Sequence, residues 1–433
     1  MEIQRNRYLQ QMIAKKWNGK IKTITGIRRC GKSYLLNRLF VNHLLNDGVA
    51  ATDIITLALD DVTNAKYRNP LELDAFIRQQ TSDVSRKYYV LLDEIQKVDS
   101  IKNPYLPHDS KEMISFVDVL LGFLNIPNID VFVTGSNSRM LSKDIVTEFR
   151  DRGDEIHVCP LTFDEFYAAY DGNKKYAWRD FWYYGGMPYI MRLKTHEEKA
   201  KYLQTLFRLT YIRDVMERNK INSDTSILDA LLDVMASAIG SLTNPNRLSN
   251  TFESTQKIKI KSDTISKYLD YFIDAFILSQ AQRYDLKGKS YISTPLKYYY
   301  SDVGLRNAKL NFRQQEENHI MENILYNELV ARGFCVDVGV VTYNSTTEDG
   351  KLKHFKLEID FVVNKGYQRY YIQSALNVDT TEKREQETKS LLKVDDSFLK
   401  IVVLKDEIIP WKDDKGILYI GIQEFLTDYI NKL

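Results

Sequence analysis

Short apolar runs and segments with helical spacing alternate along the first 160 residues. Residues 21–25 alternate apolar and polar side chains, residues 88–92 form a continuous apolar run, and residues 129–134 have the pattern of a third strand; each is followed by a glycine or an acidic residue. Residues 34–40 instead carry apolar side chains at helical intervals. Continuous apolar runs are typical of strands that are buried on both faces of a parallel sheet. The pattern therefore predicts an α/β domain built on a parallel sheet.

The middle of the chain changes from helical to alternating spacing and back. Residues 197–218 and 227–235 repeat apolar side chains at helical intervals. In residues 257–261 lysine alternates with isoleucine, which predicts a strand with its lysines on one face. Ser262 or Asp263 can cap the helix that follows, and the residues after that helix have the pattern of a β-hairpin. We therefore expect a small helical domain that ends in a hairpin.

The last part of the chain begins with an amphipathic helix that carries Ile320, Ile324, Leu325 and Leu329. Strands are then expected near residues 334–343, 355–363, 369–376 and 400–404, with a charged helix at 381–393. This order predicts a second α/β domain.

The composition limits the class of protein. A chain of 433 residues exceeds one typical core, so we expect about two to four domains. The net charge of +2 predicts no global attraction to nucleic acid, so such a partner requires a local basic patch. The widely spaced Cys30, Cys159 and Cys335 favour a reducing compartment. Because no signal peptide or membrane span is expected, we predict a cytoplasmic protein.

The strongest motif begins directly after the strand predicted at residues 21–25. Gly26-Ile27-Arg28-Arg29-Cys30-Gly31-Lys32-Ser33, followed by Tyr34, has the G-x-x-x-x-G-K-[ST] spacing of a phosphate-binding loop between a strand and a helix. The glycines permit the backbone to turn its N–H groups toward phosphates. Lys32 is the expected ligand of the β- and γ-phosphates, and the Ser33 hydroxyl is the expected ligand of Mg²⁺. The motif predicts binding of ATP with Mg²⁺.

A carboxylate pair follows the apolar run at residues 88–92. Asp93 lies where the strand ends, a position suited to holding Mg²⁺, and Glu94 follows as a candidate general base for the attacking water. After the third predicted strand, Asn137 is a candidate sensor of the γ-phosphate, although asparagine also forms ordinary turns. Arg150 and Arg152 are candidates for an arginine finger, in cis or in trans, and solvent-facing arginines are the alternative.

The motifs TGIRRCGKSYLL, VLLDEIQ, VFVTGSNSRMLS and CPLTFDEFY together resemble the archaeal-type AAA+-related ATPases, which occur in many bacteria and archaea. The resemblance implies an ATPase domain over residues 1–175. It implies that Asn137 is the sensor and that Arg152 corresponds to the arginine before the last motif. It extends through the GGMP segment at Gly185, which implies a helical lid over residues 176–221.

The helices and hairpin of residues 222–315 resemble a winged helix. Such domains often bind duplex DNA through a helix and the hairpin, and the sequence offers a local set of cationic side chains for phosphates. This set comprises Lys257, Lys259, Lys261, Lys267, Arg283, Lys287 and Lys289. Winged helices also serve as protein-docking modules, and the sequence leaves both alternatives open.

Residues 316–433 resemble the PD-(D/E)XK nuclease core, which that ATPase family often carries at its C-terminus. The resemblance implies metal ligands at Glu322, Asp360 and Gln373, but Ala375 occupies the place of the usual lysine. Lys356, Glu358 and Asp360 share one strand face, so a displaced lysine is an alternative, while the lone His354 is expected to have no metal role. We expect a degenerate nuclease-like domain.

The predicted fold class is α/β: a P-loop NTPase sheet, a helical lid, a winged-helix-like middle domain and a C-terminal restriction-endonuclease-like domain. The leading functional prediction is a Mg²⁺-dependent ATPase whose nucleotide cycle switches the attached domains, with DNA as a candidate partner and no membrane partner. The alternatives are a nucleotide-gated DNA-binding regulator with little turnover and an ATP-dependent nuclease. A homo-oligomer is required if the arginine finger acts in trans.

Overall fold

The computed structural model describes residues 3–107, 109–135, 152–219, 221, 225–313, 316–346 and 352–433. The chain divides into two compact units, which we describe separately. The first unit comprises Met1–Pro160 together with Asp274–Phe276, and the second comprises Leu161–Ile273 and Ile277–Leu433. A three-residue segment from the middle of the chain therefore belongs to the N-terminal unit.

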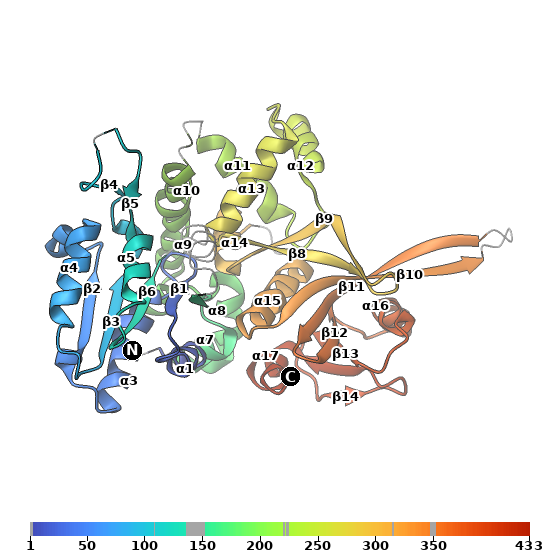
Figure 1. Cartoon of the computed structure of the whole chain (residues 1–433). Helices are drawn as coiled ribbons and strands as arrows, with labels where there is room; N and C mark the ends of the chain where they lie inside the picture. Colours follow the sequence, from blue (N-terminus) through green and yellow to red (C-terminus); the bar gives the residue numbers. More distant parts are fainter. Residues whose placement is uncertain are drawn as a thin grey trace. The chain divides into compact units, whose positions relative to one another are not determined.

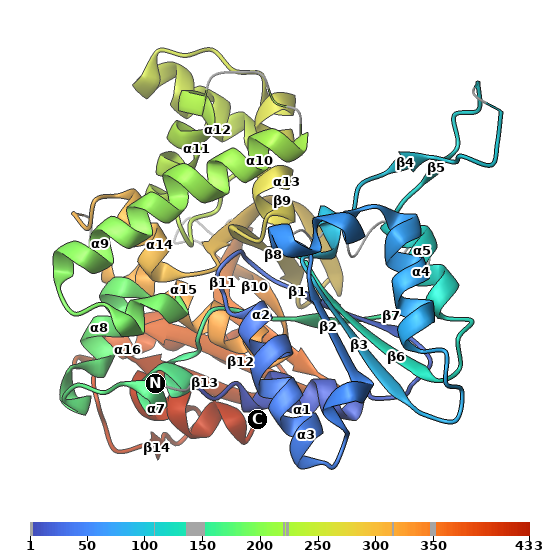
Figure 2. The same ribbon diagram turned by 90° about the vertical axis from the view of Figure 1, so that its left-hand side faces the viewer.

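The first unit is built on a five-stranded sheet in which every neighbouring pair of strands is parallel (Figure 2). The strand order is β2 (Ile54–Ala58), β3 (Tyr88–Asp93), β6 (Ile129–Thr134), β1 (Ile21–Thr25) and β7 (Gly153–His157). The predicted parallel α/β sheet is confirmed. β6 lies between β1 and β3, so the carboxyl ends of the three predicted strands meet at one edge of the sheet.

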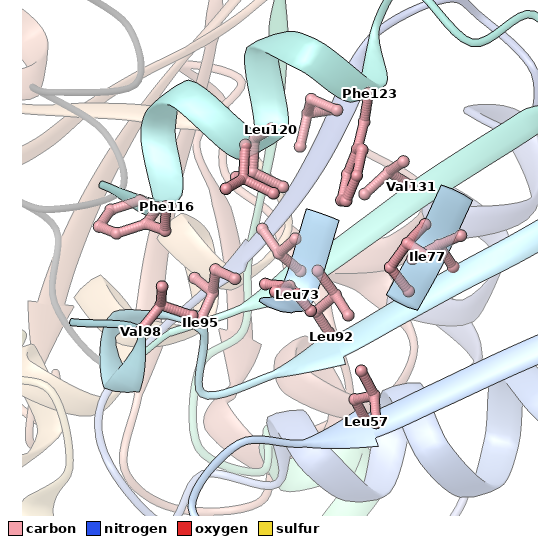
Figure 3. Close-up of a cluster of buried hydrophobic side chains, with 14 of the residues drawn as sticks. Leu57, Leu73, Ile77, Leu92, Ile95, Val98, Phe116, Leu120, Phe123 and Val131 are labelled. Atoms are coloured by element: carbon pink, nitrogen blue, oxygen red, sulfur yellow. The ribbon is translucent and has the colours of Figure 1, made fainter. Parts of the chain in front are cut away.

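Two helices cover one face of this sheet. Apolar side chains of α4 (Pro70–Gln80) and α5 (Phe116–Phe123) form a buried cluster with strand residues. Figure 3 shows Leu120 and Phe123 of α5 directed at the sheet, where Leu92 and Val131 lie. At about 25 cal/mol per Å² of apolar surface removed from water, clusters of this kind supply most of the stability of a domain.

The other face of the sheet carries the helix that follows the glycine motif. It begins as α2 (Lys32–Tyr34), continues as a π-helical segment (Leu35–Phe40) and ends as α3 (Val41–Asn46). The ring centroids of Phe40 and Phe132 lie 4.6 Å apart, which fixes this helix against β6. The unit also contains α1 (Asn6–Ala14) and a small hairpin, β4 (Ile101–Lys102) and β5 (Met113–Ile114).

The second unit begins with helices. They are α7 (Phe163–Ala169), α8 (Ala177–Tyr184), α9 (His196–Thr205), a π-helical segment (Leu206–Tyr211) and α10 (Ile212–Asn219). The helix predicted at 197–218 is therefore confirmed. Gly185 and Gly186 follow α8, and a Cβ at either position would lie about 2 Å from Asp302 or from the Leu161 carbonyl. The GGMP segment is thus a close packing contact within this unit.

Three helices and a hairpin follow. They are α11 (Thr225–Ser237), α12 (Pro245–Thr251), α13 (Ser262–Asp274), β8 (Leu278–Asp285) and β9 (Ser290–Tyr300). The predicted hairpin is confirmed, but the strand predicted at 257–261 is wrong. Lys257 adopts a left-handed conformation that ends a π-helical segment, and residues 258–261 have no regular structure. The alternation of lysine and isoleucine arises because Ile260 is buried while the lysines on either side of it are exposed. No described strand pairs with this segment.

The hairpin belongs to an eight-stranded sheet, which Figure 1 shows with its long β10–β11 arm. The order is β14 (Trp411–Lys412), β15 (Leu418–Gly421), β13 (Leu399–Leu404), β12 (Gln368–Ala375), β11 (Leu352–Lys365), β10 (Cys335–Thr346), β8 and β9. The four strands predicted for the last part of the chain are present. The helices are α14 (Val303–Lys309), α15 (Glu317–Ala331), α16 (Thr381–Thr388) and α17 (Ile422–Thr427). The helix predicted at 381–393 ends at Thr388.

Within the part of the chain that the structure describes, no helix has the length and apolar character needed to cross a membrane.

Candidate functional site

The glycine motif forms a tight loop at the carboxyl end of β1. Gly26 has a φ of 139°, and a Cβ there would lie 2.1 Å from the Val158 carbonyl oxygen. Gly31 and Arg29 also have positive φ values, 103° and 71°. These angles favour glycine, so the two glycines are required by the backbone path and by the close approach of the segment after β7. The exposed Arg29 accepts a strained conformation, which is common at functional loops.

Lys32 lies inside this loop. It is almost fully buried, and its Nζ donates to the backbone carbonyls of Gly26, at 2.9 Å, and Ile27, at 3.1 Å. These acceptors are neutral, so no carboxylate neutralises the ammonium through these bonds. Lys32 also begins the helix, where backbone N–H groups favour anions. The loop therefore combines a positive charge with an anion-binding helix terminus.

Asp93 is the centre of a hydrogen-bond network at the ends of three elements. Its carboxylate accepts from the Ser33 hydroxyl at 3.1 Å and from the Asn37 side-chain amide at 3.1 Å. The Thr134 hydroxyl, at the end of β6, also donates to this carboxylate. Asp93 is buried whereas Ser33 is exposed. The predicted pair Ser33 and Asp93 is thus brought together, and sequence reasoning missed Asn37 and Thr134.

Glu94 follows Asp93 in a left-handed conformation, with a φ of 56°. Its backbone N–H donates to the Thr134 hydroxyl at 2.9 Å, and its carboxylate accepts from the Gln96 side chain. Non-glycine residues in this conformation are uncommon, and the strain is retained only where surrounding contacts enforce it. The Thr134 bond thus fixes the backbone that carries the predicted general base.

His157, at the carboxyl end of β7, is a further member of this site that the sequence did not reveal. Its Nδ1 lies 3.1 Å from the Thr25 hydroxyl. Burial, and secondarily the positive charge of Lys32, lower the pKa of His157 to about 4, so the ring is neutral near pH 7. Its ring packs on Phe276, with centroids 4.6 Å apart. Phe276 comes from the Asp274–Phe276 segment of the same unit.

A buried arginine supports the loop from the N-terminal side. Arg5 donates from one guanidinium nitrogen to the Cys30 carbonyl, at 3.1 Å, and from the other to the Cys159 carbonyl, at 2.6 Å. Its guanidinium also lies 4.7 Å from the centroid of the Tyr8 ring. Arg5 therefore ties the phosphate loop to the segment after β7. No motif includes Arg5, so nothing in the sequence pattern points to this role.

Arg152 lies at the wrong end of the sheet to serve its own nucleotide site. It directly precedes β7, and its carbonyl accepts from the Ile21 N–H at 3.0 Å, at the start of β1. The phosphate loop follows the opposite end of β1, about 16 Å away at ~3.3 Å per residue. An arginine side chain is much shorter than this distance, so Arg152 cannot act as an arginine finger on a nucleotide bound by its own chain. Asn137 and Arg150 lie outside the described residues.

The residues at this edge of the sheet suit a magnesium–nucleotide complex. Ser33 and Asp93 present hydroxyl and carboxylate oxygens, the donor types that Mg²⁺ prefers. Lys32 and the helix N-terminus supply the positive field for phosphates. Gly26, Ile27, Arg28, Arg29, Cys30, Gly31 and Tyr34 complete the predicted loop, in which Cys30 is buried and donates its thiol to the Val158 carbonyl. The donor set fits the predicted ATP and Mg²⁺.

The predicted C-terminal metal site has a different organisation. Glu322 of α15 lies beside Glu358 and Asp360 of β11, and the ammonium of Lys297, from β9, lies among them. The Lys297 Nζ is 2.8 Å from carboxylate oxygens of Glu322 and Glu358 and 3.9 Å from Asp360. The Tyr299 hydroxyl also donates to Glu322, at 2.6 Å. A lysine from the hairpin thus lies among these carboxylates, whereas Ala375 packs in an apolar core cluster.

Charge interactions in this centre are strong because it is buried. Burial works against the ammonium, but Glu322, Asp360 and Glu358 together outweigh it and raise the pKa of Lys297. Burial, reinforced by Glu322 and opposed by Lys297, raises the pKa of Asp360 to about 8. The cluster therefore holds more acidic groups than its one lysine neutralises, and part of it is protonated near pH 7.

The donor set here does not fit a nuclease metal ion. The Gln373 side-chain oxygen accepts from the Asp360 backbone N–H, at 3.4 Å, and the Asp360 carboxylate accepts from the Ser374 N–H, at 2.8 Å. The ammonium of Lys297 lies where a cation bound by Glu322 and Glu358 would lie. Among the described residues, no three His, Cys, Asp or Glu side chains are arranged to bind a metal. Asp360 and Gln373 are thus brought together, but they bond each other while Glu322 pairs with Lys297, and the metal role of the three stays a prediction.

The basic set predicted in the middle of the chain divides into two groups. Lys259, Lys261 and Lys267 are exposed before and on α13, where Asp263 and Asp270 are exposed as well. Lys287 and Lys289 lie in the turn of the β8–β9 hairpin. The helix that a winged helix would present to DNA is therefore of mixed charge.

Comparison with known proteins identifies the N-terminal domain. Residues 18–167 match the family described as "AAA domain", and residues 175–316 match a "domain of unknown function (DUF8612)". A Walker-type ATPase of Pyrococcus abyssi has a related structure with 13% sequence identity and a TM-score of 0.49, covering 71% of this chain and 96% of the other. At that TM-score the likeness adds nothing to the assignment.

Two relatives match almost the whole chain. An uncharacterized protein of Methanocaldococcus jannaschii, MJ1544, is 27% identical over 410 residues, which cover 90% of this chain and 83% of the relative. An uncharacterized protein of Haemophilus influenzae is 31% identical over 406 residues, which cover 93% of each chain. The chain therefore belongs to the same family as this Haemophilus influenzae protein and carries an AAA domain over residues 18–167.

Proposed function

We propose that this chain is a Mg²⁺-dependent ATPase that couples its nucleotide cycle to the second unit and acts on, or is regulated by, nucleic acid. The observation that carries the proposal is the convergence of Lys32, Ser33, Asp93 and Glu94 at the carboxyl ends of β1 and β3. Ligands of open α/β sheets bind at this edge.

Each residue has a defined role in this proposal. Lys32 binds the β- and γ-phosphates, Ser33 and Asp93 hold Mg²⁺, and Glu94 accepts a proton from the attacking water. Bound Mg²⁺ neutralises charge on the phosphate oxygens. Thr134 holds both Asp93 and the backbone of Glu94, so it positions the metal ligand and the base together. Asn137 remains the proposed sensor, and Arg152 the proposed finger for a neighbouring copy.

The coupling proposal is supported by His157 and Phe276. His157 lies close enough to Lys32 for the lysine charge to lower its pKa, and its ring contacts Phe276. In the chain, Phe276 directly precedes Ile277, where the second unit resumes. Phosphates that neutralise Lys32 therefore change the electrostatic environment of a side chain that contacts this connection. We propose this route as the link from nucleotide to hairpin.

We interpret residues 222–315 as a winged helix and residues 316–433 as a nuclease-like domain that does not cleave. Thr243 forms an antiparallel bridge with Leu296 of β9, which adds a third strand position to the hairpin, as a winged helix has. The nuclease alternative is disfavoured because Lys297 occupies the carboxylate cluster. The alternative of a regulator with little turnover is separated from the ATPase by measuring hydrolysis.

The test measures phosphate release and binding of a fluorescent ATP analogue. Lys32→Ala is expected to weaken binding by more than about tenfold, since it removes the ammonium from the phosphate site. Glu94→Gln is expected to bind normally but to hydrolyse roughly 100-fold more slowly, as loss of a general base does. Lys102→Ala and Glu112→Gln, on the β4–β5 arm, are matched controls that alter exposed residues.

Two results would contradict this assignment. Normal multiple-turnover hydrolysis by Glu94→Gln removes Glu94 from its role as the base. Binding of ATP without hydrolysis, with or without DNA, favours the regulator alternative.

A further inference from the structure

A groove with a volume of about 860 Å³ lies within the second unit, outside both sites described above. It is bounded by the turn of the β8–β9 hairpin, by β10 and β12, and by residues 393–398; Figure 1 shows this hairpin alongside β10. We define the basic groove by six of its lining residues, Tyr284, Lys287, Lys289, Tyr343, Arg369 and Lys393.

The basic groove and the Lys297 centre lie on opposite faces of the sheet. Val362 of β11 packs in the core cluster with Tyr371, which lines the groove. Its neighbour Phe361 packs instead against Tyr299 of the Lys297 centre, with ring centroids 6.2 Å apart. The β10–β11 pairing shifts register here, since Asp337 pairs with Val362 and Gly339 with Ile359, and Ile359 packs in the same core cluster as Val362. This bulge lets Asp360 and Phe361 both face the Lys297 centre, although Asp360 and Val362 are two residues apart. The groove is therefore a separate surface and not part of the nuclease-like centre.

The charge of the lining favours an anionic ligand. Four cationic side chains line the groove, against two carboxylates, Asp395 and Asp396. Asp396 is already engaged, since it accepts from the Tyr371 hydroxyl at 2.6 Å and from the Phe398 backbone N–H at 3.2 Å. Cationic side chains gathered in a concave surface attract phosphates more strongly than the net charge of the chain indicates.

Arg369 is fixed in place before any ligand binds. Its guanidinium contacts two aromatic rings, at 5.8 Å from the centroid of Tyr284 and 5.7 Å from that of Phe398. Its Nε donates to the Asn364 side chain at 2.9 Å. A guanidinium held in this way loses little conformational entropy on binding a phosphate.

The lysines at the two edges are also held on ordered elements. The Asp285 carboxylate accepts from the backbone N–H groups of Lys287 and Gly288, each at 3.0 Å, which fixes the hairpin turn. On the opposite edge, the ammonium of Lys393 lies 5.2 Å from the centroid of the Tyr343 ring. Cations and aromatic rings thus alternate across the groove.

This alternation is the arrangement that binds single-stranded nucleic acid, whose phosphates pair with cations while its bases stack on rings. We infer that the basic groove binds a short run of single-stranded nucleic acid, with phosphates on Lys287, Lys289, Arg369 and Lys393 and a base on the exposed ring of Phe398. A recess of this size suits a few nucleotides, whereas a duplex is read by elements that project into its grooves. The inference rests on the nucleic-acid part of the proposed function and not on ATP hydrolysis.

The test uses the full chain without ATP and measures the fluorescence anisotropy of a labelled oligothymidylate of about 12 nucleotides. The double variant Lys287→Glu and Lys393→Glu is expected to weaken binding at least about tenfold and to reduce the slope of log K against log salt by roughly 1.4. Phe398→Ala, at an exposed ring, is expected to weaken binding by roughly tenfold through lost stacking.

The matched control is the double variant Lys259→Glu and Lys267→Glu, which makes the same charge change at exposed positions before and on α13. It is expected to keep wild-type affinity for the single strand. Equal losses in both double variants, tighter binding of duplex than of single strand, or no binding by the wild type would each overturn the inference. Binding of free thymidylate as tight as that of the oligomer would also overturn it, by showing a mononucleotide site instead. Lys32→Ala measured in parallel is expected to bind normally, which separates failure of the groove from failure of the ATPase.

Discussion

The phosphate loop and the Lys297 centre contain the same types of side chain in opposite arrangements. Each has a nearly buried lysine and a buried aspartate in a strand. In the loop, Lys32 donates to the carbonyls of Gly26 and Ile27, while Asp93 is bonded by neutral groups. In the C-terminal centre the lysine pairs directly with carboxylates. The separation of charges in the first centre leaves both of them able to act on a ligand.

In the Lys297 centre, by contrast, the lysine and the carboxylates pair with one another and are not left to act on a ligand. Lys297 directs its ammonium at Glu322, Glu358 and Asp360, so its positive charge is engaged within the centre. A buried ion pair of this kind contributes little to stability relative to apolar packing, but losing one partner is costly. The partners of a lysine, and not its burial, therefore distinguish a binding site from a structural ion cluster.

The largest expected effect follows from removing the ammonium of the second centre. Lys297→Met is expected to lower the free energy of unfolding by about 3–5 kcal/mol at pH 8, because it leaves the carboxylates unpaired. At pH 6 the loss is expected to be smaller, because the carboxyl groups then bind protons more readily. Chemical denaturation at both pH values measures the difference.

Lys309→Met is a matched control in the same unit. The Lys309 side chain is also buried, but its partners Asp229 and Asp233 are only half-buried and can be hydrated, so we expect a loss of only about 1 kcal/mol. Without nucleotide, Mn²⁺ is expected to raise the melting temperature of Lys297→Met and not that of the wild type. Stabilisation of the wild type by Mn²⁺ would show that the lysine does not take the place of a metal.

The next-largest effect is expected from changing Gly26, whose carbonyl accepts a hydrogen bond from Lys32. Gly26→Ala places a Cβ against the Val158 carbonyl, so the loop must move and ATP affinity is expected to fall about 100-fold. Gly19→Ala is the control, because Gly19 also has a positive φ but a Cβ added there would meet no atom within 4 Å. Equal affinities for ATP in the two variants would contradict the tight loop geometry. Titration of a fluorescent ATP analogue measures both.

A smaller effect is expected from the pH dependence that His157 confers. Its pKa is about 4 in the folded protein and about 6.5 when unfolded, so the folded state binds fewer protons between these values. Stability should therefore be complete above pH 6.5 and fall by about 2–3 kcal/mol as the pH decreases to 4. The difference in unfolding free energy between wild type and His157→Gln isolates this contribution. A difference that does not change between pH 7 and pH 4 would contradict it.

The smallest effect is expected for Arg152. Because Arg152 lies at the amino end of β7, Arg152→Ala is expected to change ATP hydrolysis less than about twofold in dilute, monomeric protein. A large loss that appears only as protein concentration rises would establish a finger in trans. A large loss at every concentration would contradict the geometry. The assay is phosphate release measured over a protein dilution series.

The first centre was largely predictable because its chemistry is local in sequence. The loop occupies consecutive residues, and Asp93 and Glu94 directly follow an apolar run. Thr134 was missed although it ends a predicted strand beside β3, because a single hydroxyl carries no motif. His157 was missed because β7 is polar in sequence and therefore does not have the pattern of a buried strand.

The second centre was only partly predictable because its key residue comes from another part of the chain. The sequence correctly grouped Glu358 and Asp360 on one strand face, and both contact Lys297. Lys297 itself joins them only because β8 pairs with β10 and brings β9 into the same sheet. The sequence did contain one indication of this role, because Lys297 is followed by three tyrosines that are buried in the structure. A lysine buried beside them requires an anionic partner.

The Asp274–Phe276 segment limits how this protein can be divided or recombined. A fragment that ends at Pro160 would lack Phe276, the ring that covers His157 beside the phosphate loop. Exchange of the AAA domain between relatives at that boundary would therefore separate two residues that must fit each other. The two units are encoded as interleaved segments, so a cut at Pro160 does not release the whole of the first unit.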